Sequence, residues 1–422
     1  MQDKPLRILM IVNIYPPDQA GGAVLFRDLA QGLTEKGHQV TVRTTYPYYP
    51  EWRDKSGQNG FRIRKAQDGA VALERYGLYI PRNPNSVLER MFYEGGFFLS
   101  LLRSLFRSRQ FDVVFAACPL VGAVGFAASV RALWRIPVWL NVHDLSTQAA
   151  ATSGILKEGF ATRAFNAVQT FVFNRAQAWN TLAPMMVRDL RPLLHGNQPL
   201  FCIPNWLHKT IQTQLNVYTQ KPAPLADQPL KLMYSGNIGS KQGLLEFCQT
   251  LSKSPAHFRF EIHGSGAASS QVADWVRSSG DARFSFGGLL EETEFVRGLY
   301  EADFFVITEK SGVGGSFIPS KMIPSFAVGT PVLGVSDDES PFGQEMAASG
   351  AGFRRTWAQV HELVEFIEAS PQHSPEMRQW QEKARTWSRR YHRDAIIQAY
   401  DEGLRQLANR QTVALSSPEY HA

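Results

Sequence analysis

The stretch DFFVITEKSGVGGSFIPSKMIPSFAVGTPVLGV, residues 303–335, contains two apolar runs separated by a glycine-rich loop and a segment that begins with proline. The runs Asp303–Thr308 and Pro331–Val335 are typical of buried strands. Between them we expect a helix that opens at Pro319 and ends at Gly329, because proline is favoured in the first turn and glycine just after the last. The stretch therefore predicts a strand, a loop, a helix and a strand, as in α/β folds.

The loop and the start of that helix have the chemistry of an anion site. Glycines let the backbone approach a ligand closely, and a helix N-terminus offers unpaired N–H groups and the positive end of a dipole. Ser320 lies at this start, and Lys321 adds a full positive charge. We therefore expect Pro319, Ser320 and Lys321 to bind phosphate.

The composition is that of a globular protein with more than one core. A chain of 422 residues suggests two domains, and 44% hydrophobic with 19% charged residues excludes the disordered class. The net charge of +6 is spread along the chain without long basic blocks. This pattern argues against a dedicated nucleic-acid binder and suits acidic small molecules or an anionic membrane surface.

The cysteines favour a reducing compartment, and the apolar runs favour a chain without a signal peptide or a membrane span. Cys118, Cys202 and Cys248 form no CxxC pair, so we expect neither a disulfide framework nor a metal site. The N-terminal apolar run is too short for a signal peptide, and the run 111–130 is interrupted by Asp, Pro and Gly, as in a strand followed by a helix. We expect a cytoplasmic protein whose membrane contact, if it has one, is peripheral, on the cytoplasmic face of the inner membrane.

The first half of the chain opens with a βαβ pattern. Leu6–Val12 is a continuous apolar run, typical of a parallel strand buried on both faces, and a loop, a helix and the strand His38–Thr44 follow it. Right-handed crossovers of this kind build a doubly wound sheet. Further strands are expected at 112–117, 137–142 and 178–182.

The same order of elements restarts at Leu230. A strand, the loop GNIGSKQG (236–243) and a helix precede strands at 258–263 and 284–286. The expected parts are an N-terminal domain at 1–206, a linker at 207–230, a second domain at 231–390, and a C-terminal helix and tail at 391–422 that cross back to the first domain. Doubly wound sheets bind ligands at the carboxyl ends of their strands. The residues alone therefore predict an enzyme for a nucleotide or another phosphorylated ligand.

Five segments, in order and spread over nearly the whole chain, carry a family resemblance. They are YPPDQAGGAVLFRDLAQGLTEKGHQVTV (15–42), VWLNVHDL (138–145), IPNWL (203–207), MYSGNIGSKQGL (233–244) and PSKMIPSFAVGTPVLG (319–334). Together they resemble the GT-B glycosyltransferases of the retaining family 4, and within it bacterial enzymes that assemble exopolysaccharide or O-antigen units, the colanic-acid type included. The resemblance implies two doubly wound, Rossmann-like domains that face each other across a cleft.

In the first half, the resemblance assigns three contacts. Gly21 and Gly22 would lie against the donor diphosphate, where a side chain would collide; a tight turn after the first strand is the alternative. His143, at a strand end, would lie beside the donor sugar as a catalytic group, unless it is only a satisfied polar side chain. Asp144 would orient His143 or the acceptor, or cap the segment that follows.

In the second half, the resemblance assigns the nucleotide contacts. Gly236, Asn237 and Lys241 lie in a loop that resembles the second phosphate-contacting segment. Asn237 stands where many members have an arginine, so Lys241 is the expected source of charge, with a solvated turn lysine as the alternative. Gly264 and Gly266 resemble the loop near the nucleobase and the ribose.

The 303–335 segment also departs from the family pattern. Family members usually have two glutamates eight residues apart, which contact the donor sugar and the ribose, and Ser316 and Pro324 occupy those positions here. Glu309 is a candidate donor-sugar contact, or otherwise a surface-loop glutamate. An inactive GT-B scaffold that binds nucleotide or glycan and partners an active transferase therefore remains an alternative function. A dehydrogenase is disfavoured, since no GxGxxG follows the first strand.

The resemblance also implies the reaction and its partners. Transfer would retain the anomeric configuration and need no glycosidase-type carboxylate pair, and no metal or other cofactor is expected. The partners would be a nucleotide-sugar and a lipid-diphosphate-linked or oligosaccharide acceptor. Residues 88–109 combine a dense apolar run with Arg103, Arg107 and Arg109, which suits an interfacial helix as well as a core helix with a basic end.

Overall fold

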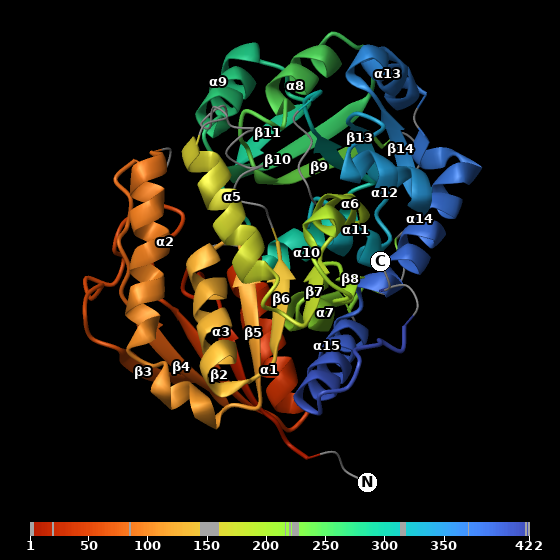
Figure 1. Ribbon diagram of the computed structural model, residues 1–422. Helices are drawn as coiled ribbons and strands as arrows, with labels where there is room; N and C mark the ends of the chain where they lie inside the picture. Colours follow the sequence, from red (N-terminus) through yellow and green to blue (C-terminus); the bar gives the residue numbers. More distant parts are fainter. Residues whose placement is uncertain are drawn as a thin grey trace. The chain divides into compact units, whose positions relative to one another are not determined.

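The computed structural model describes residues 4–18, 21–83, 86–143, 160–215, 217–218, 221, 228–312, 318–369, 371–417 and 420 (Figure 1). The chain divides into two compact units. Unit 1 comprises Met1–Asn205 and Asp394–Ala422, and unit 2 comprises Trp206–Arg393. Each unit is an α/β layer structure with its own sheet, as the two βα patterns of the sequence predict.

Unit 1 has an eight-stranded sheet in the order β3-β4-β2-β1-β5-β6-β7-β8, in which only the β3–β4 pair is antiparallel. The strands are β1 (Arg7–Ile11), β2 (Gln39–Thr45), β3 (Arg64–Asp68), β4 (Val71–Tyr76), β5 (Val113–Cys118), β6 (Val138–Val142), β7 (Ala178–Thr181) and β8 (Leu200–Cys202). Its helices are α1 (Gly21–Glu35), α2 (Val87–Leu102), α3 (Val121–Trp134), α5 (Phe160–Phe173), α6 (Pro184–Leu190) and α15 (Arg393–Ala408), with short turns η1 (Phe106–Gln110) and η2 (Arg191–Leu193).

Helices cover both faces of this sheet, which explains why its central strands are apolar throughout. Figure 1 shows α2, α3 and α5 along one face, and alternate residues of β5 such as Val114 and Ala116 join their core. On the other face, Phe115 packs edge-on against Tyr400 of α15. The Tyr400 hydroxyl also accepts hydrogen bonds from Asn141 and Asn180, both at 3.0 Å. The C-terminal helix is thereby an integral part of unit 1.

Unit 2 has a six-stranded parallel sheet in the order β11-β10-β9-β12-β13-β14. The strands are β9 (Leu230–Asn237), β10 (Phe258–Ser265), β11 (Phe284–Gly287), β12 (Phe304–Thr308), β13 (Val332–Val335) and β14 (Gly352–Arg355). Its helices are α7 (Lys209–Leu215), α8 (Leu244–Ser252), α9 (Ser269–Ser279), α10 (Glu292–Glu301), α11 (Met322–Val328), α12 (Pro341–Ser349), α13 (Val360–Glu368) and α14 (Pro375–Ser388), with single turns η3 (Trp357–Gln359), η4 (Pro371–His373) and η5 (Arg389–Tyr391).

Two expectations about this half are wrong. The segment 207–230 is not only a linker, because it contains α7, whose Ile211 joins the unit 2 core together with Leu207. The helix expected to open at Pro319 begins at Met322 and has seven residues. The amide of Met322 donates to the Pro319 carbonyl at 3.0 Å, so a turn precedes the helix.

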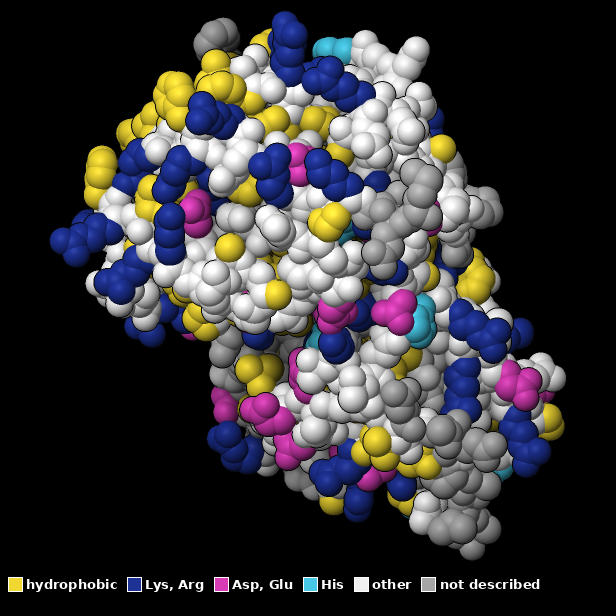
Figure 2. All heavy atoms as spheres, turned by 90° about the horizontal axis from the view of Figure 1, so that it is seen from below, with side chains coloured by type: hydrophobic (Ala, Val, Ile, Leu, Met, Phe, Trp, Pro, Cys, Tyr) yellow, Lys and Arg dark blue, Asp and Glu magenta, His cyan; other side chains and the backbone are white. Residues whose placement is uncertain are grey.

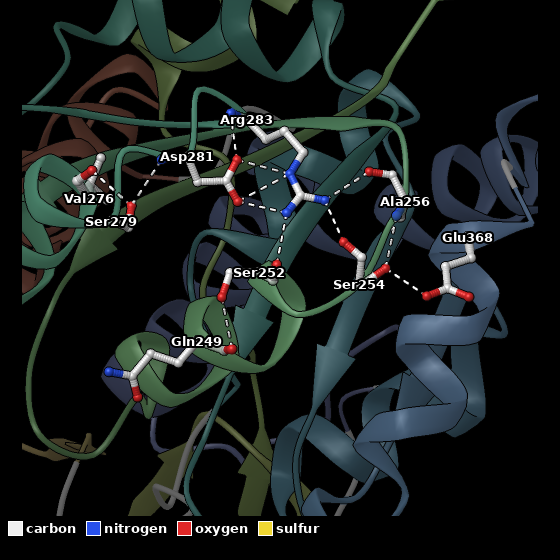
Figure 3. A network of polar contacts seen from close by, with 9 residues as sticks. All are labelled: Gln249, Ser252, Ser254, Ala256, Val276, Ser279, Asp281, Arg283 and Glu368. Atoms are coloured by element: carbon white, nitrogen blue, oxygen red, sulfur yellow. Dashed lines mark hydrogen bonds and ion pairs between the residues drawn. The ribbon is translucent and has the colours of Figure 1, made fainter.

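The amino edge of the unit 2 sheet is held by one arginine (Figure 3). The Arg283 guanidinium donates to the carboxylate of Asp281 and to three carbonyls at and after the end of α8, those of Ser252, Ser254 and Ala256, at 2.6 to 3.1 Å. Its hydrogen bonds lower the pKa of Asp281. The Ser254 hydroxyl in turn donates to Glu368 of α13 at 2.7 Å. These bonds satisfy polar groups at the edge away from the carboxyl ends of the strands.

Candidate functional site

The carboxyl ends of β9 and β10 require glycine at two facing positions. Gly236 and Gly264 lie opposite each other in the strand register, with φ of 156° and 148°. A Cβ on Gly264 would lie 2.0 Å from the Gly236 carbonyl oxygen, and one on Gly266 would lie 2.5 Å from that of Ile238. The fold therefore requires glycine at these positions, because the two strand ends approach each other too closely for a side chain.

Lys321 lies beside Gly236, so the structure brings together the two segments that the sequence assigned to phosphate. A Cβ on Gly236 would lie 3.5 Å from Cδ of Lys321. The ammonium group of Lys321 lies 4.7 Å from the ring centroid of Phe295, and burial lowers its pKa. Within the described parts of the chain Lys321 forms no ion pair. The Glu292 carboxylate, which is paired with His208, attracts the Lys321 ammonium group only at longer range. A cation in this state is suited to receive an anionic ligand.

Other predicted phosphate contacts are less enclosed. Lys241 and Asn237 are exposed, and the Lys241 carbonyl accepts a hydrogen bond from the Lys310 amide at 2.8 Å. This bond joins the 236–243 loop to the end of β12. Pro319 is half-buried and Ser320 is exposed, both in the turn before α11. Because α11 starts two residues after Ser320, Lys321 is the stronger source of positive charge at this edge.

Glu309 lies at the same edge, directly after β12. Its side chain is half-buried, and among the described residues its Oε2 atom has no hydrogen-bond partner. Burial raises the pKa of Glu309 to about 7. Its backbone is held firmly, since its amide donates to the Val335 carbonyl at 2.8 Å and its carbonyl accepts from the Trp357 indole at 2.7 Å. Glu309 is thus a partly protonated carboxyl group near neutral pH.

Of the two positions where family members usually have glutamates, the structure describes only one. Pro324 is buried within α11, so no carboxylate is present there. Ser316 lies outside the described residues, as does Asp144 of the first half.

In unit 1, His143 follows β6 at the carboxyl edge of the sheet. Its amide donates to the Cys118 carbonyl at 3.1 Å, and its ring lies 5.0 Å from that of Phe26 in α1. Burial lowers the pKa of His143 to about 4. The imidazole is therefore neutral at physiological pH and can donate or accept a single hydrogen bond at each nitrogen.

Gly21 and Gly22 are the first two residues of α1, and the fold leaves room for a side chain at both positions. A Cβ on Gly21 would meet nothing within 4 Å, and one on Gly22 would only touch Ile14 at 3.4 Å. Neither residue has a positive φ, so the tight-turn alternative does not explain them. A ligand that approaches the backbone at the start of this 15-residue helix would account for two glycines there.

Sequence reasoning missed two carboxyl groups at the carboxyl edge of unit 1. Asp18 is 3% exposed, and its Oδ1 accepts from the amides of Tyr48 and Tyr49 at 2.9 Å. Its Oδ2 has no hydrogen-bond partner in the part of the chain that the structure describes. Burial raises its pKa. Glu94 of α2 accepts from the Gly122 amide at 2.9 Å, and burial raises its pKa to about 8. The only sequence signal was the position of Asp18 just before the Gly21-Gly22 pair.

Known proteins share both the sequence pattern and the fold. The glycosyl transferase 4-like domain family matches residues 20–206. A protein of Escherichia coli K12, WcaI, provisionally described as a colanic acid biosynthesis glycosyl transferase, is 23% identical over 353 residues, which cover 80% of this chain and 85% of that protein.

Solved structures extend the likeness over both units. Sucrose-phosphate synthase of Thermosynechococcus elongatus is 16% identical with a TM-score of 0.68, and covers 96% of this chain and 100% of that one. HepE of Anabaena, solved in complex with UDP-glucose, is 14% identical with a TM-score of 0.62, and covers 96% of this chain and 99% of that one. The two Rossmann-like units and these solved structures show that the chain has the GT-B fold, and its residues 20–206 are similar to the glycosyl transferase 4-like domain family.

Proposed function

We propose that this glycosyltransferase moves a sugar from a nucleoside-diphosphate sugar to a hydroxyl of a lipid-linked or oligosaccharide acceptor during assembly of a bacterial surface polysaccharide. The observation that carries the proposal is the half-buried Lys321 beside Gly236, which forms no ion pair among the described residues. WcaI is described as a colanic acid enzyme, and HepE was solved with UDP-glucose, which supports this acceptor class and a nucleotide-sugar donor.

In the proposed reaction, the bond between the anomeric carbon and the diphosphate breaks, and negative charge grows on the leaving phosphate. Lys321 would stabilise that charge, helped by the backbone of the glycine-bearing strand ends. Removing such a preorganised contact typically costs about 10²–10³-fold in rate. Because the cation belongs to the protein, the proposal requires no metal or other cofactor.

Unit 1 would contribute neutral groups. We propose that the uncharged imidazole of His143 hydrogen-bonds the donor sugar, because a cation there would oppose the positive charge that develops at the anomeric carbon. Gly21 and Gly22 would let the diphosphate approach the start of α1. Retention of configuration is proposed by family resemblance, with a phosphate oxygen of the donor taking the acceptor proton.

The decisive experiment is a donor and acceptor screen. Thermal shift with UDP, GDP and ADP identifies the nucleotide, and turnover is then measured with the matching sugar nucleotides and a lipid extract. Transfer that is lost in Lys321→Met supports the proposal, and NMR of the anomeric proton tests retention. Nucleotide binding with no transfer to any acceptor would instead favour the scaffold, for which the absence of a carboxylate at Pro324 is the specific argument.

A further inference from the structure

Acidic side chains follow the strands at the edge of unit 2 that is proposed to bind the donor diphosphate. The chain as a whole is basic, and dark blue Lys and Arg side chains cover more of the face drawn in Figure 2 than magenta Asp and Glu side chains do. At the carboxyl edge of the unit 2 sheet, however, Glu309 follows β12, and Asp337 and Asp338 follow β13. Because a carboxylate repels a diphosphate, each of these groups needs a physical reason at this place.

The two aspartates after β13 have different partners. Asp338 forms an exposed ion pair with Arg354 of the neighbouring strand β14. Asp337 bonds instead to the residues that follow β12, the neighbour on the other side. Its Oδ1 accepts from the Ser311 hydroxyl at 2.8 Å and its Oδ2 from the Gly312 amide at 2.7 Å, and these bonds lower the pKa of Asp337. The Asp337 carboxylate therefore holds the backbone that leaves β12.

Residues 309–312, here called the β12 exit segment, are held from the other strand ends as well. On the side of β9, the Lys310 amide donates to the Lys241 carbonyl at 2.8 Å. From the turn after β14, the Trp357 indole donates to the Glu309 carbonyl at 2.7 Å. The backbone of the β12 exit segment is thus fixed by hydrogen bonds within the protein, and a precise contact to a ligand requires such a fixed backbone.

The side chain of Glu309, in contrast to its backbone, keeps an unused hydrogen-bonding position. Its Oε2 atom is buried and has no hydrogen-bond partner among the described residues. Burial raises the pKa of Glu309 to about 7 in spite of the contact with Ser340, so the group repels a diphosphate less than an exposed carboxylate would. A buried oxygen without a partner costs free energy, which a hydroxyl group of a ligand recovers. Sugars supply such hydroxyl groups.

We propose that Glu309 hydrogen-bonds a hydroxyl of the donor sugar and that Asp337 is the residue that positions it. The inference rests on the proposed function, because it needs a nucleotide-sugar at this edge. Strand β12 is flanked by β9, whose end carries Gly236 with Lys321 beside it, so Glu309 leaves the sheet next to the proposed diphosphate contact. The chain would thereby have a carboxyl group for the sugar although Pro324 occupies one of the usual glutamate positions.

The test separates the sugar from the nucleotide. Isothermal titration calorimetry compares UDP, GDP and ADP with UDP-glucose, GDP-mannose and ADP-glucose. We expect Glu309→Met to bind the preferred sugar nucleotide about tenfold more weakly than wild type and the matching nucleoside diphosphate within about twofold, because only the sugar loses a hydrogen bond. Glu309→Gln should retain most of the affinity, since it keeps a hydrogen-bonding side chain of the same shape.

The positioning role is tested by coupling between the two residues. Asp337→Ala should reproduce the result of Glu309→Met, and the control Asp338→Ala should not, because the Asp338 carboxylate pairs with Arg354. In the double variant Glu309→Met/Asp337→Ala the loss should be no larger than in Glu309→Met alone, since Asp337 acts through Glu309. Trp357→Phe removes only the indole donor to the Glu309 carbonyl and gives a second reading if Asp337→Ala folds poorly.

Equal weakening of the sugar nucleotide and the nucleoside diphosphate in Glu309→Met would overturn the inference, since the residue would then serve the phosphates or the fold. Additive losses in the double variant, or wild-type affinity in Glu309→Met, would also contradict it. Lys321→Met tests the proposed function separately, because loss of the cation should weaken both ligands alike. A wild-type protein that binds none of these compounds would contradict the proposed function and this inference together.

Discussion

The two edges of the unit 2 sheet treat their charges in opposite ways. At the amino edge, Arg283 donates to the Asp281 carboxylate and to three carbonyl groups, so its hydrogen-bonding capacity is used within the protein. At the carboxyl edge, Lys321 has no ion pair among the described residues, and Glu309 keeps a buried oxygen without a partner. Satisfied charges stabilise the fold, whereas unsatisfied ones store free energy that a ligand can release.

The largest effect is expected at Lys321. Lys321→Met should lower kcat/KM for the preferred donor by about 10²–10³-fold, because the growing charge on the leaving diphosphate loses its cation. The free energy of unfolding of this variant should stay level or rise, since a half-buried charge with no ion pair among the described residues disappears. Steady-state kinetics and urea denaturation measure the two quantities. A variant that unfolds more easily but reacts at the wild-type rate would reverse the roles assigned to the two edges.

Removing the Arg283 guanidinium should lower stability and leave activity unchanged, the opposite of the result expected for Lys321. Arg283→Met should lower the free energy of unfolding by about 2–3 kcal/mol, because partly buried carbonyl groups lose their donor and Asp281 loses its partner. The activity per folded molecule should not change. Urea denaturation with Lys253→Met as the control, an exposed lysine in the same connection after α8, checks this expectation. A loss of kcat in folded Arg283→Met would show that the amino edge also serves the reaction.

Glu309 should make stability depend on pH. Its folded pKa of about 7 lies above the ordinary glutamate value of 4.5, so the folded state holds a proton that the unfolded chain releases. The contribution of this proton to the free energy of unfolding is complete below about pH 4.5 and is lost as the pH rises through 7. Relative to Glu309→Gln, wild type should lose about 1–2 kcal/mol between these limits, after allowance for the part of the side chain that solvent reaches. Parallel pH dependence of the two proteins in urea denaturation would show that burial does not raise the pKa of the Glu309 carboxyl group.

The smallest effect concerns His143, the corresponding uncharged group in unit 1. Because burial lowers its folded pKa to about 4, the imidazole should stay neutral from about pH 8 to 5.5. Its NMR resonances should not shift over that range. A midpoint for His143 between about pH 6 and 7 would contradict a neutral contact to the donor sugar.

Several features of the fold were predictable because they depend on local pattern. Continuous apolar runs identified β1 and β5, and the run at 111–130 is indeed a strand followed by α3. The short helix α7 was missed because its polar residues hide the spacing of Leu207, Ile211 and Leu215, which only the unit 2 core makes meaningful. The late start of α11 was missed because proline signals an N-terminus only approximately.

By itself, the sequence determined the two α/β units, the glycosyltransferase resemblance and the choice of Lys321 and His143 as site residues, because strand periodicity and motif order are local properties. Tertiary structure alone decided which charges are satisfied. It placed Lys321 beside Gly236, and it left one oxygen of Glu309 and one of Asp18 without a hydrogen-bond partner among the described residues. Burial and Coulomb interaction depend on distances between residues far apart in the chain, and no local pattern contains them.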